Sequence, residues 1–447
     1  MITPPEDDFM ITDILLSPAS TRSSETRADS GEILRLDWHA SGDVCLDSFY
    51  SNFHLSHPFL LPKPDLAARA RTHDMEPLLT AVRWVGSLYL KSLSAQLNLF
   101  DKAHGMIYDT TKTKDGFTVQ AMMLLVLGLG GSGRQEEARK VLSDAQAIAL
   151  EIGMNTRAYA VSHGESTPVL EESWRRTWWD LYVIDGLIAG VHRCTSFPLF
   201  DVPCNVDLPC EEFEYLAGWI PPPTSIDNLM APEFADESQP LSSYAYRISA
   251  IRILGNLVRL RETKNTNTNQ VQSLLTNWQL HLPPHKRDCL QQDGSPDEMM
   301  FQAFMIVHMT SILLHLPHSQ ITFTPAHSIT SCAAQIEVHA DGIHNAHTQH
   351  ALHSANEIST MVTYPVPLQT HSPLFSCIVT LSSIVHVGKI LSGIPFDIDR
   401  TRQQLGLNIG ALTQMARIWK IAEDSVRQTR SVTGELQRGG MMKSGRW

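Results

Sequence analysis

The sequence predicts an all-α fold, with one large helical domain between two tails. Apolar residues recur at spacings of three and four through most of the 447 residues, which is typical of helices that bury one face. No run alternates apolar and polar residues between turn signals, no strand–helix–strand rhythm appears, and no unit repeats at a fixed period. We expect a disordered acidic tail at residues 1–44, one domain at residues 45–430 with a proline-rich internal loop, and a flexible tail at residues 431–447.

Composition indicates a soluble chain with a substantial core, working inside the cell and without a membrane partner. Hydrophobic residues make up 43% of the chain, and no apolar run approaches the ~18 residues that a membrane span requires. The acidic N-terminus argues against a secretory leader, and seven cysteines without a C-x-x-C pair predict reduced thiols. The formal charge of −12 repels phosphate, so nucleic-acid binding would need a local basic patch or another module.

The N-terminal tail contains an acidic and apolar segment at residues 6–16. Its acidic members are Glu6, Asp7, Asp8 and Asp13, and its bulky apolar members are Phe9, Met10, Ile11, Ile14, Leu15 and Leu16. Such a mixture stays dissolved until a partner's groove accepts the apolar side chains. The alternative is a solvated tail whose leucines dock on the domain itself.

Helical periodicity then continues along the chain, interrupted by turns and loops. The predicted helical segments span residues 77–108, 117–129, 135–152, 242–263, 271–282, 297–316, 374–391 and 405–428. Gly153 is expected to end the third segment in a left-handed C-cap conformation. The proline-rich loop is predicted at residues 219–240, and residues 265–269 form a polar break.

The most informative helix begins near residue 168 and is apolar around most of its circumference. Its apolar members are Trp174, Trp178, Trp179, Leu181, Tyr182, Val183, Ile184, Leu187 and Ile188. A helix that is apolar on nearly every side is expected in the centre of a fold. Thr167 and Pro168 suit its beginning, and Gly190 with the later prolines is expected to end it.

Charged side chains along the same helix are spaced four residues apart. This spacing pairs Glu171 with Arg175, Glu172 with Arg176, and Arg176 with Asp180. We therefore expect the two arginines to serve these ion pairs rather than phosphate.

Together these residues resemble the regulatory domain, or middle homology region, of fungal zinc-cluster transcription factors. The resemblance rests on an acidic residue, R-R-x-W-W, a later Asp and D-L-P, which are here Glu171, Arg175, Arg176, Trp178, Trp179, Asp185, Asp207, Leu208 and Pro209. Further matches are His57 with Pro58, the helix that ends at Gly153, the W-x-x-x-L-P at residues 278–283, and an L-H-x-P stretch where Leu316 replaces the usual Arg. The resemblance covers residues 45–430 and implies a structural role for these signature residues.

The resemblance implies a nuclear, pathway-specific regulator of RNA polymerase II transcription, represented here by its regulatory domain. It implies control of activation and dimerisation, in a homodimer or a heterodimer with related regulators, and a response to a small molecule. Residues 6–16 would then contact a coactivator. DNA is a partner through the resemblance alone, and contact by this chain is expected to be weak or indirect.

The zinc cluster of the family is missing from this sequence. Two zinc ions would need six thiolates in two C-x-x-C-x(6)-C halves, but Cys45 is the only cysteine before residue 194. We therefore expect no cofactor in this chain. The alternatives are a co-regulator without DNA binding of its own and an α-helical enzyme.

A glycine-rich turn at residues 128–133 satisfies G-x-G-x-x-G and is followed by Glu151. A dinucleotide site needs a short strand before this turn, whereas the preceding thirteen residues are rich in Met, Leu and Ala and suit a buried helix. The favoured interpretation is a turn in a helical hairpin.

A row of histidines with three-residue spacing forms another candidate. It comprises His344, His347, His350 and His353, with His339 before it and Glu357 after it. Adjacent imidazoles could share a metal ion only with a third ligand from elsewhere. The alternative is a partly solvated helix face.

Cys194, Cys204 and Cys210 crowd one loop, but their spacing does not form a thiolate knuckle, so we expect them to line the loop over the tryptophan helix. Basic residues gather near the C-terminus, where interrupting acidic residues favour solvated charges over phosphate contacts. No catalytic signature appears. The sequence therefore predicts no catalytic, cofactor-binding or metal-binding residue and no enzyme.

Overall fold

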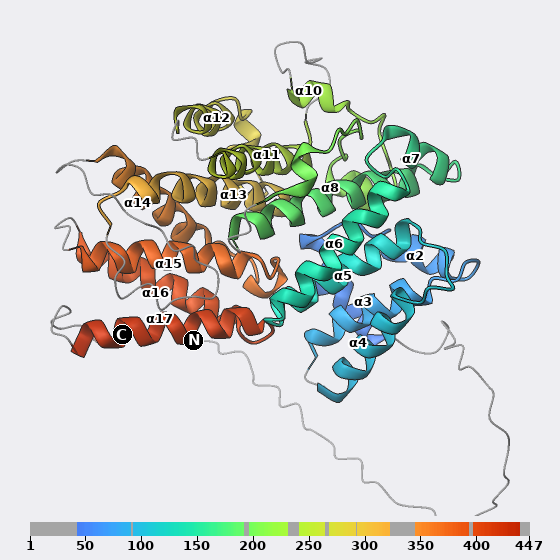
Figure 1. Ribbon diagram of the computed structural model, residues 1–447, viewed down its shortest axis with the longest axis horizontal. Coiled ribbons are helices and arrows are strands. Elements are labelled where there is room, and N and C mark those ends of the chain that lie inside the picture. Colours follow the sequence, from blue (N-terminus) through green and yellow to red (C-terminus); the bar gives the residue numbers. More distant parts are fainter. Residues whose placement is uncertain are drawn as a thin grey trace, which may run out of the picture. The chain divides into compact units, whose positions relative to one another are not determined.

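The computed structural model describes residues 43–90, 93–191, 196–230, 241–263, 268–291, 293–321, 345–392 and 397–438. Within these residues the chain forms seventeen α-helices and no β-strand, so the all-α prediction is confirmed (Figure 1). The described helices belong to one compact unit that begins at Asp43. The acidic segment at residues 6–16 and the last part of the proline-rich loop, residues 231–240, lie outside the described residues.

The first part of the fold is a group of helices around the buried α5. The elements are α1 (Val44–Asn52), η1 (His54–Ser56), α2 (Lys63–Ala70), α3 (Glu76–Leu88), α4 (Leu93–Ile107), α5 (Gly116–Gly131), α6 (Gln135–Glu151) and α7 (Arg157–His163). The single helix predicted at residues 77–108 is wrong, because α3 ends at Leu88 and α4 begins at Leu93. Gly153 after α6 has φ 77°, which confirms the predicted left-handed conformation.

The tryptophan helix, α8 (Pro168–Val191), lies between this group and the later helices (Figure 1). It begins at Pro168 as predicted, and all of its residues after Glu171 are buried. The helix ends at Val191, one residue after Gly190, which agrees with the predicted end within the usual uncertainty of a helix boundary. One glycine inside a helix costs only about 1 kcal/mol relative to Ala, which packing against α11 can offset.

A loop follows α8 and returns across it before the next long helices begin. It contains η2 (Pro198–Asp201), α9 (Glu212–Ala217) and α10 (Ile226–Met230). The following elements are α11 (Ser243–Glu262), α12 (Asn269–Leu280), η4 (Pro284–Lys286), α13 (Glu298–His315), η5 (Leu316–His318) and α14 (Ala346–Met361). The side chains of Ser242 and Asp297 accept hydrogen bonds from backbone N–H groups in the first turns of α11 and α13, which fixes where both helices start.

One segment, Glu298–His318, is long and apolar enough to cross a membrane by length and composition, which the sequence interpretation missed. Of its apolar window, 89% is buried inside the fold. It packs against α11 and α14, and its burial is that of a core helix.

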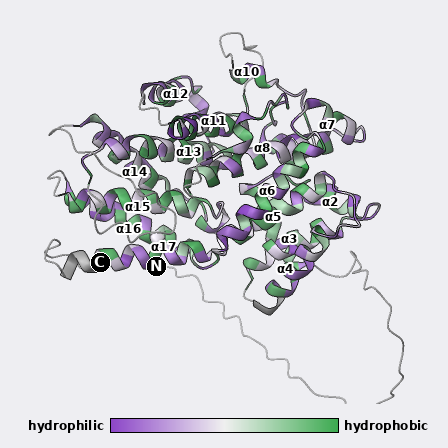
Figure 2. Cartoon of the chain, viewed as in Figure 1, coloured by the Kyte–Doolittle hydropathy of each residue, from purple (hydrophilic) through white to green (hydrophobic). Residues whose placement is uncertain are grey.

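The last helices form a stack of nearly parallel rods, drawn in orange and red in Figure 1. They are η7 (Leu368–Thr370), α15 (Phe375–Leu391), α16 (Ile398–Met415) and α17 (Lys420–Arg438). The single helix predicted at residues 405–428 is therefore wrong, and α17 extends beyond residue 430, where the predicted domain ends. Figure 2 shows hydrophobic and hydrophilic residues along most helices, as expected where each helix has one face on a core.

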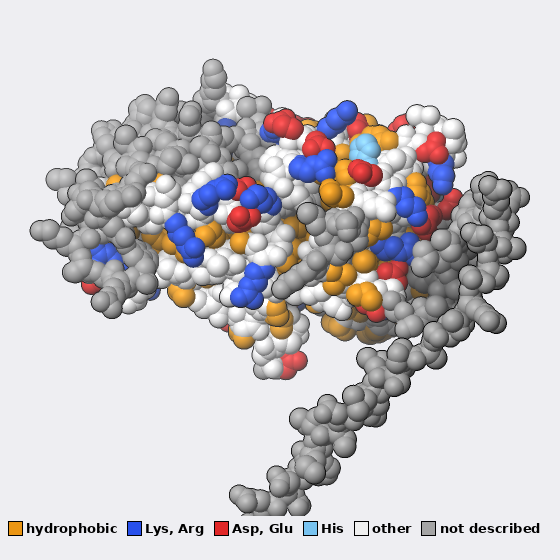
Figure 3. Space-filling model, turned by 90° about the horizontal axis from the view of Figure 1, so that it is seen from below, with side chains coloured by type: hydrophobic (Ala, Val, Ile, Leu, Met, Phe, Trp, Pro, Cys, Tyr) orange, Lys and Arg blue, Asp and Glu red, His pale blue; other side chains and the backbone are white. Residues whose placement is uncertain are grey.

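The basic residues near the C-terminus lie among acidic ones. Lys420 lies 2.8 Å from Glu423, and Arg427 is paired with Asp424. Figure 3 shows the molecule from below, where Lys and Arg side chains are interspersed with Asp, Glu and hydrophobic side chains. The described part of this face lacks the continuous basic surface that a phosphate backbone requires.

Candidate functional site

The acidic residue Glu172 holds both arginines of α8. Its two carboxylate oxygens each lie 2.8 Å from a guanidinium Nε, one of Arg175 and one of Arg176. The predicted pairs of Glu172 with Arg176 and of Glu171 with Arg175 are both confirmed, the second at the longer distance of 3.9 Å. Burial raises the pKa of Glu172, but the two guanidinium groups outweigh it and leave the pKa below its ordinary value. Glu172 is therefore a buried carboxylate that carries its charge.

Arg176 joins α8 to the returning loop. Its Nη1 lies 2.6 Å from Glu212, and its Nη2 donates to the carbonyl oxygen of Cys210 at 2.9 Å. The guanidinium carbon lies 4.0 Å from the centre of the Tyr215 ring, a cation–π contact. A fully buried arginine is stable here because carboxylates, a carbonyl and an aromatic ring replace water around it.

Asp180 has partners that the sequence did not predict. The predicted pair with Arg176 is wrong, because the Asp180 carboxylate lies 2.6 Å from Arg247 Nη1 and 2.9 Å from His57 Nδ1. The hydroxyl of Tyr244 donates to the same carboxylate at 3.2 Å. Burial raises the pKa of Asp180, but Arg247 and His57 outweigh it and bring the pKa to about 2. Asp180 is thus the charged centre that connects α8, α11 and the segment after η1.

The two consecutive tryptophans hold the loop that carries the D-L-P sequence. Trp179 Nε1 donates to the carbonyl oxygen of Asp207 at 3.0 Å, and Trp178 Nε1 contacts Cys204 Sγ at 3.0 Å. The Asp207 carboxylate in turn accepts from Arg157 Nε at 2.9 Å. These contacts explain why both rings are fully buried although each carries a polar N–H group.

The rest of the D-L-P sequence connects the loop to its surroundings. Leu208 N–H donates to the carbonyl oxygen of Thr224 at 2.8 Å, and the carbonyl oxygen of Pro209 accepts from Ser242 Oγ at 2.6 Å. Since Ser242 also caps α11, the loop positions the start of that helix. The structure therefore brings the Asp207 to Pro209 part of the signature against its α8 part.

Asp185 differs from the other acidic residues of the signature because no cation among the described residues pairs with it. Its carboxylate accepts from the Leu199 N–H at 2.9 Å, and its exposed fraction is 3%. Burial raises its pKa to about 7, although the hydrogen bonds from Leu199 and from the Gln146 side chain oppose this shift. Asp185 therefore titrates near neutral pH inside the fold.

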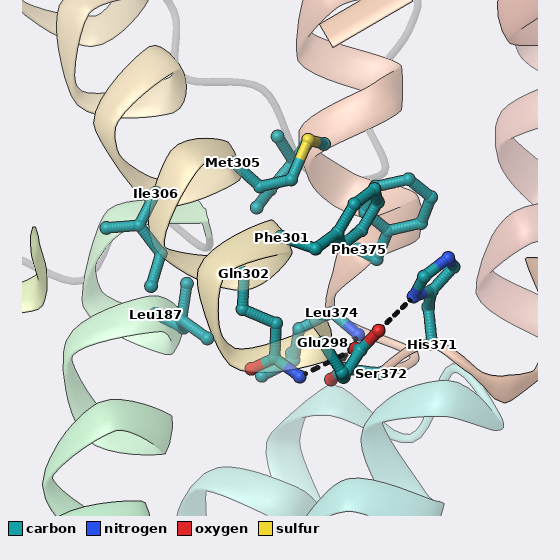
Figure 4. Close-up of a pocket in the computed structure, with 11 residues that line it drawn as sticks. Leu187, Glu298, Phe301, Gln302, Met305, Ile306, His371, Ser372, Leu374 and Phe375 are labelled. Atoms are coloured by element: carbon teal, nitrogen blue, oxygen red, sulfur yellow. Dashed lines mark hydrogen bonds and ion pairs between the residues drawn. The ribbon is translucent and has the colours of Figure 1, made fainter. Parts of the chain in front are cut away.

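A small apolar cavity lies beside this network, between α8, α13 and the start of α15 (Figure 4). Its apolar wall includes Leu187, Phe301, Met305, Ile306 and Phe375. Its volume is about 20 Å³, which is room for about one water molecule. In this conformation the cavity is too small for an organic ligand.

Polar side chains connect the cavity to Asp180. On the cavity wall, His371 Nδ1 lies 2.8 Å from Glu298, and the Gln302 side chain donates to Glu298 at 2.9 Å. Ser372, the next residue, hydrogen-bonds at 2.8 Å to His57, which contacts Asp180. Hydrogen bonds therefore connect the cavity wall at Ser372, through His57, to Asp180 of α8.

The histidine row lies on α14 and faces histidines of α13, which the sequence interpretation missed. His315 Nδ1 lies 2.8 Å from His347 Nδ1, and the His315 and His350 rings stack at 4.5 Å. His339 and His344 lie outside the described residues. Across the described ranges, no three histidine, cysteine or acidic side chains are placed to hold a metal ion.

The glycine motif has a packing explanation. Gly128 and Gly131 lie inside α5, and a side chain at either position would collide with the ring of Trp84 or of Trp419. Helix α5 occupies the place where a nucleotide site needs a strand. The interpretation as a helical hairpin is confirmed, since α5 and α6 form the hairpin. The turn between them begins after Gly131, the fourth residue of the motif.

Cys204 and Cys210 line the loop over α8 as expected, in contact with Trp178 and Arg176. Cys194 lies outside the described residues.

The comparisons with known proteins agree with the pattern of α8 and its loop. The model of a family described as "Fungal specific transcription factor domain" matches residues 46–283. A curated protein, the C6 finger domain transcription factor iacK of Pestalotiopsis fici (strain W106-1 / CGMCC3.15140), is 47% identical over 397 residues. The match covers 88% of this chain but 59% of that protein, so the chain spans less than two thirds of its relative. No solved structure matches the chain.

Proposed function

The chain belongs to the family defined by the fungal-specific transcription factor domain, and we propose that it is the regulatory domain of a nuclear, pathway-specific regulator of RNA polymerase II transcription. The observation that carries the proposal is the match over residues 46–283, which includes α8, its ion pairs and the returning loop. The relative's description as a transcription factor supports it. The signature residues serve architecture in this proposal, because nearly all of them are buried and their polar groups are bonded to other residues of α8, the returning loop and the neighbouring helices.

The mechanism follows from where the buried charges lie. Asp180 connects α8 to α11 through Arg247 and to the cavity wall through His57 and Ser372. A ligand or partner that moved the start of α15 would change this buried network. Few other arrangements of the network are stable, because each buried charge must keep its partner. The domain would thereby hold or release the activation and dimerisation functions.

Contact with specific DNA is assigned to another segment of a longer protein or to a partner. The described cysteines do not fit a six-thiolate zinc cluster, since Cys204 and Cys210 lie against α8, and Cys289 and Cys377 are buried. The net charge of −12 and the interspersed surface charges also disfavour binding of phosphate. The same observations favour a second candidate, a co-regulator that pairs with intact family members.

A reporter assay tests the proposal. The full chain and a variant lacking residues 1–44 are each fused to a heterologous DNA-binding domain, with a fluorescent tag to follow nuclear accumulation. We expect activation by the full chain and less activation after the deletion, since residues 6–16 carry the proposed coactivator contact. Failure of both fusions to activate contradicts an activator, and co-purification with an intact family member would then support the co-regulator.

We further propose that the chain has no catalytic activity. The test is a thermal-shift scan of the purified full chain with nucleotides, together with metal analysis. A nucleotide-induced rise in Tm or a stoichiometric bound metal would contradict this proposal and favour the enzyme alternative.

A further inference from the structure

A groove of about 600 Å³ opens where the N-terminal helix group meets the C-terminal stack. The ends of α1, α3 and α5, the helix α4, η7 and the turn between α16 and α17 contribute to it. We call it the Arg417 groove and define it by Tyr89, Gln96, Gln369, Arg417, Ile418 and Lys420, which are part of its lining. Its volume lies within the range of about 300–1,000 Å³ that is usual for small-molecule sites, unlike the small cavity beside α13.

The charges of the groove select an anion. Arg417 is exposed, and no described carboxylate forms an ion pair with it. Lys420 lies 2.8 Å from Glu423 and 3.5 Å from Asp424, so its charge is largely compensated. No Asp or Glu is among the described residues that line the groove. Among the described residues, the Arg417 guanidinium therefore has no acidic partner, and its planar donors suit a carboxylate.

A second observation concerns buried donors beside the groove. The hydroxyl of Tyr89, a lining residue, is buried and has no hydrogen-bond partner among the described residues. The same holds for Nε1 of Trp419, whose ring meets the Tyr89 ring edge-on at 5.7 Å. Burial raises the pKa of Tyr89, so this hydroxyl keeps its proton and remains a donor. Native buried donors are rarely left without an acceptor, and a ligand is one way to supply it.

Part of the remaining wall is apolar, while Ser48, Asn52, Gln96, Ser132 and Gln369 make the rest of it polar. Leu88, Leu90 and Ile418 line the groove together with the Tyr89 ring. A fully hydrated inorganic ion would gain nothing from this surface, whereas an organic body would bury it. The wall therefore favours an anion with an apolar part.

We propose that the Arg417 groove binds a small organic acid, whose carboxylate pairs with Arg417 and whose apolar body lies against Leu88, Tyr89 and Ile418. Binding would add a contact between the end of α3 and the turn between α16 and α17, which already meet through the rings of Tyr89 and Trp419. Occupancy would stabilise the docking of the C-terminal stack. The binding itself is independent of the proposed function, and only its meaning as a regulatory signal rests on that function.

The test uses the full chain and two fluorescent probes of the same shape. 8-Anilinonaphthalene-1-sulfonate is an anion with an aromatic body, and N-phenyl-1-naphthylamine lacks the charged group. Titrations are made with the parent chain and with Arg417→Ala, Tyr89→Phe and Arg430→Ala. Arg430 is an exposed arginine of α17 that does not line the groove, so its variant is the matched control.

We expect saturable binding of one anionic probe per chain, weakened about tenfold by Arg417→Ala and unchanged by Arg430→Ala. The neutral probe should bind both arginine variants with affinity within twofold of the parent, since it has no charge to pair. Tyr89→Phe should leave the Tm at or above that of the parent and weaken the anion severalfold. No saturable binding, equal losses in both arginine variants, or no loss in Arg417→Ala would overturn the proposal, whatever the reporter assay shows.

Discussion

The carboxylate of Asp180 and the guanidinium of Arg247 lie 2.6 Å apart, and both side chains are completely buried. The pair joins α8 to α11 in the centre of the fold. Arg247 Nε and Nη2 have no hydrogen-bond partner among the described residues, so Asp180 provides the compensation for this buried charge. Removing one member leaves the other charge in a low-dielectric environment, which costs far more than loss of a surface pair.

We predict that Asp180→Asn and Arg247→Met each lower the free energy of unfolding by about 3–5 kcal/mol. Urea denaturation of the full chain measures this. The double variant should lose less than the sum of the two, because it leaves no unpaired charge. Arg402→Met, which removes a pair with the exposed Asp399, is the control and should change stability by about 0.5 kcal/mol or less. Similar small losses in the three single variants, Asp180→Asn, Arg247→Met and Arg402→Met, would contradict a buried charged pair.

The contacts of α8 could be predicted from the sequence only where they are local. Glu172 and Arg176 are four residues apart on one helix, so their pairing follows from helix geometry. Asp180 looked equally available to Arg176, but its partner His57 lies 123 residues earlier in the chain, and Arg247 lies on another helix. A spacing pattern offers only partners on the same helix, and tertiary packing decides among them.

The two helix breaks were missed for a related reason. The turn after α3 and the turn between α16 and α17 contain no proline or glycine among residues 89–92 and 416–419, and apolar residues keep their spacing across both. Tyr89 and Trp419 instead fill the junction where the two turns meet, ring against ring. This arrangement depends on residues far apart in the sequence. The spacing of apolar residues therefore could not predict the Arg417 groove.

Asp185→Asn should make the stability of the chain less dependent on pH. The pKa of Asp185 is about 7 in the fold and about 4 when unfolded. Between these values the unfolded chain releases a proton that the folded chain keeps, so stability falls as the pH rises from 4 to 7. We expect the variant to match the parent near pH 4 and to exceed it at pH 8 by on the order of 4 kcal/mol.

Urea denaturation at pH 4, 6 and 8 measures this difference. The control is Asp399→Asn, since Asp399 has 87% of its side chain exposed. An Asp185→Asn variant that differs from the parent by the same amount at every pH would contradict a buried carboxyl that titrates near neutrality.

The histidines between α13 and α14 predict loss of stability in acid. Burial, with the neighbouring His350, His347 and His318, lowers the pKa of His315 to about 3. In the unfolded chain the His315 imidazole has its ordinary pKa of about 6.5, so below that pH it binds a proton that it does not bind in the folded chain. The contribution of His315 to the free energy of unfolding is therefore complete above pH 6.5 and decreases as the pH falls toward 3.

The slope of the unfolding free energy against pH reports how many protons the chain takes up when it unfolds. His315→Gln should therefore reduce this uptake by up to about one proton between pH 6 and 4. Denaturation curves at half-unit intervals measure the slope. His353→Gln is the control, because that imidazole is 65% exposed. Equal slopes for the parent and His315→Gln would show that another group controls acid unfolding.

Two glycines in helices should respond in opposite directions to the same substitution. A methyl group at Gly186 of α8 would lie 2.7 Å from Ile251 Cγ1 and from the Phe197 ring, whereas one at Gly410 of α16 would meet nothing within 4 Å. Gly186→Ala should cost about 1–3 kcal/mol through overpacking. Gly410→Ala should gain about 0.5–1 kcal/mol, because alanine loses less backbone entropy in a helix. Urea denaturation measures both changes, and a stabilising Gly186→Ala would contradict the close contact of α8 with α11.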